Sequence, residues 1–214
     1  MSQRTTGLRA VLSSAAIYQG LQDLLGGRRF QRRFIRDFVA PPPGSRLLDI
    51  GCGTGALVEH VAADVAYHGF DLSPRYVAAA RARWGDRGQF WQASVAEAPR
   101  LAGGSFARAT AVGVLHHLDD AEAGGLVALA AAALDDDGAL VTYDPALSAA
   151  TGRLARFLIE RDRGQHVRSP DGYARLLAAG FAEVTVTPVI GHLRIPYTAC
   201  VIVARRPHRP SQPA

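Results

Sequence analysis

The sequence predicts an α/β fold with a doubly wound, mostly parallel sheet. From Arg46 onward, apolar runs typical of buried strands alternate with segments typical of helices, and this alternation favours parallel strands joined by crossover helices. A glycine-rich turn joins the first strand to the next helix, and the last two strand-like segments are close enough in sequence to pair antiparallel. With 214 residues and 48% hydrophobic composition, the chain can bury one sizeable core but hardly two.

Two helices are expected before the sheet. The first covers residues 8–25 and ends at a pair of glycines, which is a common stop signal. The prolines at 41–43 end the second helix because proline cannot donate to the helix ladder. This second helix places four apolar side chains on one face: Phe30, Phe34, Ile35 and Phe38. We interpret that face as core packing, and a lid over a pocket is the alternative.

The hydrophobic pattern defines the elements of the sheet region. The expected strands cover residues 46–50, 65–72, 88–95, 106–115, 139–145, 181–189 and 197–206. The expected helices cover residues 56–63, 73–84, 119–138 and 169–180. Ser73 and Pro74 suit the N-cap and first turn of one helix, and Gly180 suits the C-cap of the last. We therefore predict three parts: a helical cap at 1–44, an α/β domain at 45–206 and a disordered basic tail at 207–214.

The glycine turn after the first strand is compatible with a dinucleotide. Gly51, Gly53 and Ala56 match the fingerprint G-x-G-x-x-[GA]. Asp71 ends the second strand about twenty positions later, where a ribose-binding carboxylate is expected. An NAD-dependent oxidoreductase is therefore one interpretation, with its ligand at the carboxyl ends of the strands.

Asp49 and a third glycine, Gly55, favour a different ligand. A carboxylate at the mouth of the turn repels a pyrophosphate but suits a ligand with a positively charged amino group. S-adenosylmethionine carries such a group together with a sulfonium and a ribose, and it has no phosphate. The segment LLDIGCGTG at residues 47–55 resembles the first motif of the class I S-adenosylmethionine-dependent methyltransferases almost letter for letter.

The resemblance covers most of the chain after Arg46 and implies a Rossmann-like methyltransferase fold. Its seven strands would follow the order 3-2-1-4-5-7-6, with the last strand antiparallel, and Asp71 would take both ribose hydroxyls. The residues expected to bind S-adenosylmethionine are Asp49, Gly51, Cys52, Gly53, Gly55, Asp71, Leu72, Ser94, Val95 and Gly113. Two positions depart from the family pattern. Ser94 stands where an acidic residue often accepts from the adenine amino group, and Ala107 stands where an aspartate often follows the phenylalanine of the fourth strand.

Three polar residues after the fourth and fifth strands are the catalytic candidates. His116 and His117 lie at the rim toward which the methyl group would point. Either can act as a general base near neutral pH, or one can pack on the cofactor while the other faces solvent. Asp144 can hold or deprotonate an acceptor, or serve as an N-cap. No clustered metal ligands accompany them, so no metal is expected.

Residues that bind the methyl acceptor are expected outside the common core. They would come from the N-terminal helices around Tyr18 and Gln22 and from the insertion at 146–169. The insertion carries Arg153, Arg156, Arg161, Arg163, His166 and Arg168. If several of these point inward, the acceptor is anionic; if they point outward, they form a solvated helix face. The resemblance implies a small-molecule acceptor methylated at O, N or C, as in secondary metabolism, and a fold repurposed for a non-methylating reaction is the remaining alternative.

Charge and cysteine content bear on nucleic-acid binding, on disulfide or zinc sites and on the location of the protein. The net charge of +5 comes from arginine alone, because the sequence has no lysine. This indicates a compositional bias rather than a nucleic-acid surface. The two cysteines are too far apart in sequence for a disulfide framework or a zinc site, and they favour a cytoplasmic protein. No apolar run reaches the length of a membrane span, and no signal peptide is expected. A homodimer is compatible with all of these features.

Overall fold

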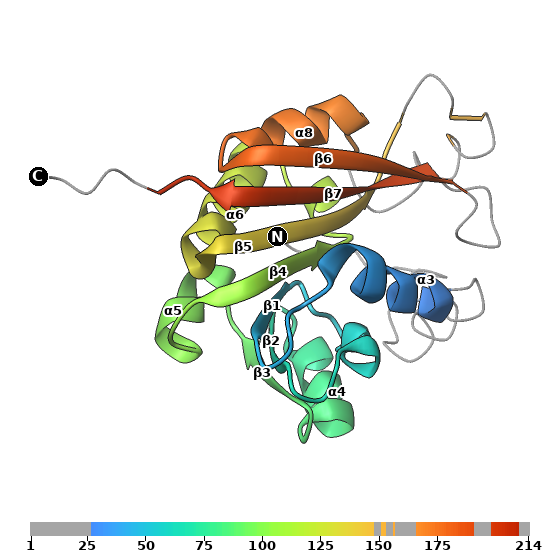
Figure 1. Ribbon diagram of the computed structural model, residues 1–214. Coiled ribbons are helices and arrows are strands. Elements are labelled where there is room, and N and C mark those ends of the chain that lie inside the picture. Colours follow the sequence, from blue (N-terminus) through green and yellow to red (C-terminus); the bar gives the residue numbers. More distant parts are fainter. Residues whose placement is uncertain (1–26, 148–150, 153–155, 157–165, 191–197, 210–214) are drawn as a thin grey trace, which may run out of the picture.

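A seven-stranded sheet forms the centre of the protein, as a computed structural model shows (Figure 1). The structure describes residues 27–147, 151–152, 156, 166–190 and 198–209. The strands are β1 (Arg46–Ile50), β2 (Ala66–Asp71), β3 (Gly88–Gln92), β4 (Phe106–Val112), β5 (Leu134–Pro145), β6 (Phe181–Ile190) and β7 (Thr198–Pro207). Their order is β3-β2-β1-β4-β5-β7-β6. β1 to β5 are parallel to one another, whereas β7 is antiparallel to both of its neighbours, so the predicted topology is confirmed.

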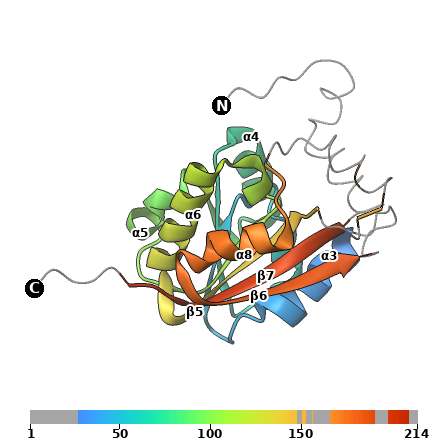
Figure 2. The ribbon, with the colours of Figure 1, turned by 90° about the horizontal axis from the view of Figure 1, so that it is seen from above.

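Helical segments cover both faces of this sheet. They are α3 (Gly27–Phe34), the π-helical turn η1 (Ile35–Val39), α4 (Pro74–Trp84), α5 (Ala98–Leu101), α6 (Asp120–Ala133) and α8 (Pro170–Ala178), with the 3₁₀ turns η2 (Ala56–His60), η3 (Val95–Glu97) and η4 (Leu115–His117). One core packs α5, α6 and α8 against the sheet, and the other packs α3, η1, η2 and α4 against the opposite face. Figure 2 shows α6 and α8 on one side of β5 to β7 and α3 on the other.

The apolar face of the second predicted helix lies in the core. Phe34 is fully buried, Phe30 and Ile35 are nearly so, and Phe38 is partly buried against the same cluster. The Phe30 ring lies 4.4 Å, between centroids, from that of Tyr143 on β5. Core packing is therefore confirmed for these side chains. The first predicted helix, with Tyr18 and Gln22, lies outside the described residues.

Several predicted boundaries are wrong. α6 ends at Ala133 rather than at residue 138, because Leu134 is already extended and begins β5. The helix predicted at 56–63 is the five-residue 3₁₀ turn η2. At the end of α8 the C-cap is Ala179, not Gly180. A side chain at Gly180 would place its Cβ 2.8 Å from Val127 Cγ1 on α6, so this glycine permits close packing instead of ending the helix.

Two other local predictions have clear outcomes. Ser73 is the N-cap of α4 and accepts a hydrogen bond from the Tyr76 amide, with Pro74 at the first helical position, as predicted. The predicted tail begins too early, because β7 includes Pro207 and the Arg209 guanidinium donates to Asp136 and to the Leu134 carbonyl. Within the described part of the chain, no helix is both long and apolar enough to cross a membrane.

A buried histidine lies in the core beside β4. His68 on β2 is 6% exposed, stacks on Trp91 and contacts the edge of the Phe106 ring. Neither of its ring nitrogens has a hydrogen-bond partner within the described residues. Burial, with a smaller contribution from the charge of Arg46, lowers the pKa of His68 to about 4. The ring is therefore neutral in the folded protein at neutral pH.

We expect acid to destabilise the fold partly through His68. On unfolding, the pKa of this ring returns to about 6.5, so the unfolded chain binds the proton more tightly than the folded chain. The free energy of unfolding should fall as the pH drops below about 6.5 and continue to fall until the pH nears 4. Between about pH 7 and pH 4.5, the melting temperature of His68→Phe should therefore fall less than that of the wild type. Circular dichroism measures both melting temperatures.

The control is His208→Phe, which changes an exposed histidine and should keep the acid sensitivity of the wild type. Equal losses of melting temperature in the wild type and His68→Phe would show that another group is responsible.

Candidate active site

The glycine turn lies at the carboxyl end of β1, where the sheet branches toward β2 on one side and β4 on the other. Gly51, Gly53 and Gly55 all have positive φ, at 72°, 54° and 74°, which side chains rarely tolerate. At Gly51 a Cβ would also lie 2.6 Å from Val114 Cγ2. The turn therefore needs glycine for its backbone and for its approach to the loop after β4. Such a branch point is where doubly wound sheets bind ligands.

Asp71 links this turn to the end of β2. Its Oδ2 accepts a hydrogen bond from the Gly53 amide at 2.9 Å, and its Oδ1 accepts one from the Ser73 amide at 2.8 Å. The side chain is half-buried. A carboxylate oxygen has two lone pairs, so each oxygen retains the capacity to accept from a ligand hydroxyl. Asp71 thus lies at the end of β2 beside the glycine turn, and its binding of ribose stays a prediction.

The two neighbours predicted with Asp71 differ in their surroundings. Leu72 is 75% exposed, an unusual position for a large apolar side chain that is next to a polar crevice. Ser94, after β3, is the N-cap of η3, and its hydroxyl accepts from the Ala96 amide at 3.3 Å. The Ser94 oxygen that was expected to accept from adenine therefore already accepts one backbone hydrogen bond. Val95 is buried in the core.

Asp49 lies beneath the glycine turn rather than at its mouth, where the sequence placed it. The side chain is only 2% exposed. Its Oδ1 accepts a hydrogen bond from Thr110 Oγ1 at 2.7 Å, and its Oδ2 accepts one from the Tyr67 hydroxyl. Burial outweighs these hydrogen bonds and raises the pKa of Asp49 to about 6. The carboxylate is still mostly charged at neutral pH, directly under the turn.

Cys52 belongs to the hydrophobic core on one face of the sheet. Its thiol is buried under the turn, and burial raises its pKa far above the ordinary value, with the charges of Asp49 and Asp71 adding to the rise. A thiol in such surroundings stays protonated and is a poor nucleophile. The expectation that Cys52 is among the cofactor-binding residues stays a prediction.

His116 and Asp144 form a buried pair below the rim. His116 Nδ1 lies 2.8 Å from Asp144 Oδ1, and the His116 amide donates to the same oxygen at 3.1 Å. Asp144 is fully buried and His116 is 5% exposed. Burial raises the pKa of Asp144, and the interactions with His116 lower it by less. Asp144 is therefore not a surface N-cap, and its Oδ1 is engaged by His116.

The pair is close to the glycine turn. Gly113 directly follows β4 and has a positive φ of 67°. Its amide donates a hydrogen bond to the Tyr143 carbonyl at 2.7 Å. Val114 packs against Gly51, because a Cβ atom at Gly51 would lie only 2.6 Å from Val114 Cγ2. His117 is exposed, with its ring centroid 4.0 Å from that of His116. The structure thus brings together the predicted residues of β1, β2 and β4.

Sequence reasoning missed Tyr67 and Thr110, and it considered Arg168 only as a possible ligand of an anionic acceptor or as part of a solvated face. Tyr67 and Thr110 hold Asp49, and Arg168 anchors the loop of His116. Only Thr110 had a usable signal, since it is a polar residue in a buried strand and lies opposite Asp49 in the sheet register. Among the other arginines of the insertion, Arg156 is exposed, and Arg153, Arg161 and Arg163 lie outside the described residues. No cluster of three or more metal-ligand side chains occurs in the described ranges.

Comparisons with known proteins agree with this geometry. Residues 47–138 match a family model described as a methyltransferase domain. No sequence among curated proteins matches the chain. Among solved structures, the Burkholderia thailandensis 1,6-didemethyltoxoflavin-N1-methyltransferase, with its substrate and S-adenosylhomocysteine bound, is 25% identical with a TM-score of 0.66. The match covers 92% of this chain and 85% of that one.

Two further structures share the fold at lower identity. Human N-acetylserotonin methyltransferase, in complex with S-adenosylmethionine, is 19% identical with a TM-score of 0.65. That match covers 90% of this chain and 54% of the human one, so the chain spans little more than half of that protein. The [4+2]-cyclase SpnF is also 19% identical, with a TM-score of 0.67 and coverage of 85% and 81%. These likenesses show the fold.

We expect Tyr67→Phe to destabilise the protein. The change removes the hydroxyl that donates to buried Asp49 and leaves a carboxylate oxygen with one partner fewer, at a cost of about 1–3 kcal/mol. The free energy of unfolding, measured by urea denaturation, should fall by this amount. Tyr76→Phe is the matched control, because Tyr76 is only half-buried on α4, and it should change stability little. An unaltered free energy of unfolding in Tyr67→Phe would show that Asp49 does not depend on this hydroxyl.

Proposed function

We propose that the protein transfers a methyl group from S-adenosylmethionine to a small-molecule acceptor, because residues 47–138 match a methyltransferase-domain family model and the sheet has the strand order of the class I methyltransferase fold. The acceptor atom is O, N or C, and a role in secondary metabolism fits this chemistry. The observation that carries the proposal is the pairing of the left-handed glycine turn with Asp71 on the neighbouring strand.

The crevice suits an adenosyl ligand without phosphates. Asp71 already accepts two backbone amides and can accept the two ribose hydroxyls on its remaining lone pairs. Exposed Leu72 offers an apolar platform to a purine ring. The charge of Asp49 lies under the turn and disfavours a pyrophosphate at that point, whereas it favours a cationic ligand. These features support S-adenosylmethionine over NAD.

S-adenosylmethionine supplies an electrophilic methyl group on its sulfonium. The chain's own residues would align the acceptor and, for an acidic acceptor, remove its proton. His116 suits that second task. Its Nδ1 is held by Asp144, and a carboxylate partner favours the tautomer with the proton on Nδ1. Nε2 is then the basic atom that accepts a proton from an acceptor hydroxyl or amine.

The first test is ligand binding. We expect S-adenosylmethionine and S-adenosylhomocysteine to bind in isothermal titration calorimetry and NAD to bind much more weakly. Asp71→Ala removes hydrogen bonds from ribose to a charged group, which are worth about 1.5–3 kcal/mol, so Kd should rise about 10- to 100-fold. Asp86→Ala, an exposed aspartate after α4, is the control and should bind as the wild type does.

Tighter binding of NAD than of S-adenosylmethionine would contradict the proposal. An unchanged Kd in Asp71→Ala would remove Asp71 from the ribose site. Tight binding of S-adenosylmethionine without release of S-adenosylhomocysteine, over a panel of phenols, alcohols and amines, would favour the repurposed alternative.

We expect His116→Gln to lower kcat for a hydroxyl acceptor by about 10²- to 10⁴-fold, the usual contribution of a general base. His117→Gln should have a far smaller effect, because His117 is exposed and Asp144 pairs with its neighbour. The measurement is S-adenosylhomocysteine release at saturating S-adenosylmethionine. A larger loss in His117→Gln would reverse the two assignments.

A further inference from the structure

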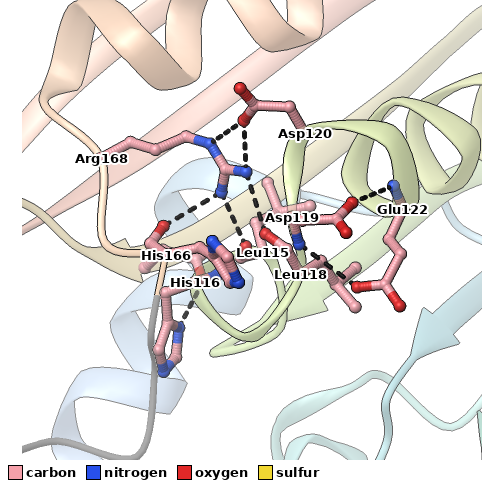
Figure 3. A network of polar contacts seen from close by, with 9 residues as sticks. Leu115, His116, Leu118, Asp119, Asp120, Glu122, His166 and Arg168 are labelled. Atoms are coloured by element: carbon pink, nitrogen blue, oxygen red, sulfur yellow. Dashed lines mark hydrogen bonds and ion pairs between the residues drawn. The ribbon is translucent and has the colours of Figure 1, made fainter.

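Residues 166–168, just before α8, lie against the loop that carries His116 (Figure 3). The His166 amide donates to the His116 carbonyl at 3.0 Å. The Arg168 carbonyl accepts from the Leu147 amide at 3.3 Å, so the same segment also touches the chain that follows β5. Two loops on either side of the His116–Asp144 pair are therefore tied to one three-residue segment.

The Arg168 guanidinium makes five hydrogen bonds in this place. Nη1 donates to the Leu115 carbonyl at 2.9 Å and to the His166 carbonyl at 3.1 Å. Nη2 donates to the Leu118 carbonyl at 2.9 Å and to Asp120 Oδ1 at 2.7 Å, and Nε donates to the same Asp120 oxygen at 3.0 Å. Arginine has five N–H donors, so none is left over.

This saturation excludes a role in binding an anionic acceptor. A guanidinium that held a carboxylate or phosphate of the acceptor would have to release at least one of these partners. The side chain is also only 12% exposed, although its partner Asp120 is 92% exposed. Of the insertion's arginines, Arg168 is thus directed inward at the protein's own backbone.

The loop needs this support because η4 is a single 3₁₀ turn. Two backbone hydrogen bonds close the turn, from the His117 amide to Val114 and from the Leu118 amide to Leu115. The carbonyls at a helix end have no partner within the helix. Arg168 donates to the Leu118 carbonyl just after the turn and adds a second donor to the Leu115 carbonyl, which already accepts from the Leu118 amide.

We propose that Arg168 is a positioning residue, which fixes the turn of His116 so that the imidazole keeps its contact with Asp144 and presents one nitrogen to the acceptor. The inference rests on the proposed function for its catalytic meaning, but the positioning itself does not depend on methyl transfer. Lysine cannot replace the arginine. The planar guanidinium reaches three carbonyls and a carboxylate at once, whereas a single ammonium group cannot.

The experiment compares Arg168→Gln and Arg168→Lys with the matched control Asp120→Ala. The control removes the exposed ion pair and leaves every carbonyl contact of Arg168 in place. The primary measurement is the ¹⁵N spectrum of the His116 ring in histidine-labelled protein, assigned with His116→Gln. S-adenosylmethionine affinity and, for any acceptor found, kcat and KM complete the comparison.

In both Arg168 variants the His116 ring signals should shift from the single Nδ1–H tautomer toward the mixed tautomers of free histidine. The control should superimpose on the wild type. Kd for S-adenosylmethionine should stay within about twofold, because Asp71 and the glycine turn are untouched, while kcat should fall about 10- to 100-fold through misplacement of the base. Arg168→Lys covers the case in which Arg168→Gln does not fold.

Wild-type His116 signals in a folded Arg168 variant would overturn the proposal, even if the melting temperature fell, because the role would then be structural only. Failure of the wild type to bind S-adenosylmethionine would overturn the proposed function instead, and the ring spectra would still decide whether Arg168 positions His116.

Discussion

The hydrogen bond from the Gly53 amide to Asp71 is the contact on which the candidate site depends. It joins the turn after β1 to the end of β2, so these two segments are held side by side. The turn can reach Asp71 only because three residues with positive φ bend it back over the sheet. A side chain at Gly51 would collide with Val114 and disturb the loop that leads to His116. Cofactor crevice and candidate base are therefore set by the same few backbone positions.

Two carboxylates of unlike exposure serve this turn. Asp71 is half-buried and open to a ligand, whereas Asp49 is enclosed by Tyr67 and Thr110. Burial raises the pKa of Asp49 to about 6, the hydrogen bonds from Tyr67 and Thr110 oppose this rise, and the negative charge of Asp71 adds to it. A positively charged ligand above the turn would lower the free-energy cost of ionising Asp49. The same attraction would strengthen binding of that ligand. Under the proposed function, the buried carboxylate would contribute to selectivity for a cationic ligand without touching it.

Much of this fold could be predicted from the sequence, because hydrophobic runs and the glycine spacing are local signals. The α/β class, the Ser73 cap and the place of Asp71 follow from them, whereas the strand order follows from the resemblance to the class I methyltransferases. The end of α6 does not, since Leu134 to Gly138 reads equally well as helix and the pairing with β4 decides for a strand. Asp49 was placed at the mouth because its partner Tyr67 lies on another strand, 18 positions away. Such contacts are set by register, which a single sequence does not display.

His116 and the residues that contact it show the same limit of sequence-based prediction at longer sequence separations. His116 could be recognised as a candidate from its place after β4, but its equal neighbour His117 could not be set aside. The structure separates the two through Asp144, 28 positions on, and through Arg168, 50 positions beyond Leu118. An imidazole whose Nδ1 is held by a buried carboxylate carries its proton on that atom and presents Nε2 as its single basic nitrogen. Under the proposed methyl transfer, a ring constrained in this way would suit a proton transfer that must coincide with methyl attack.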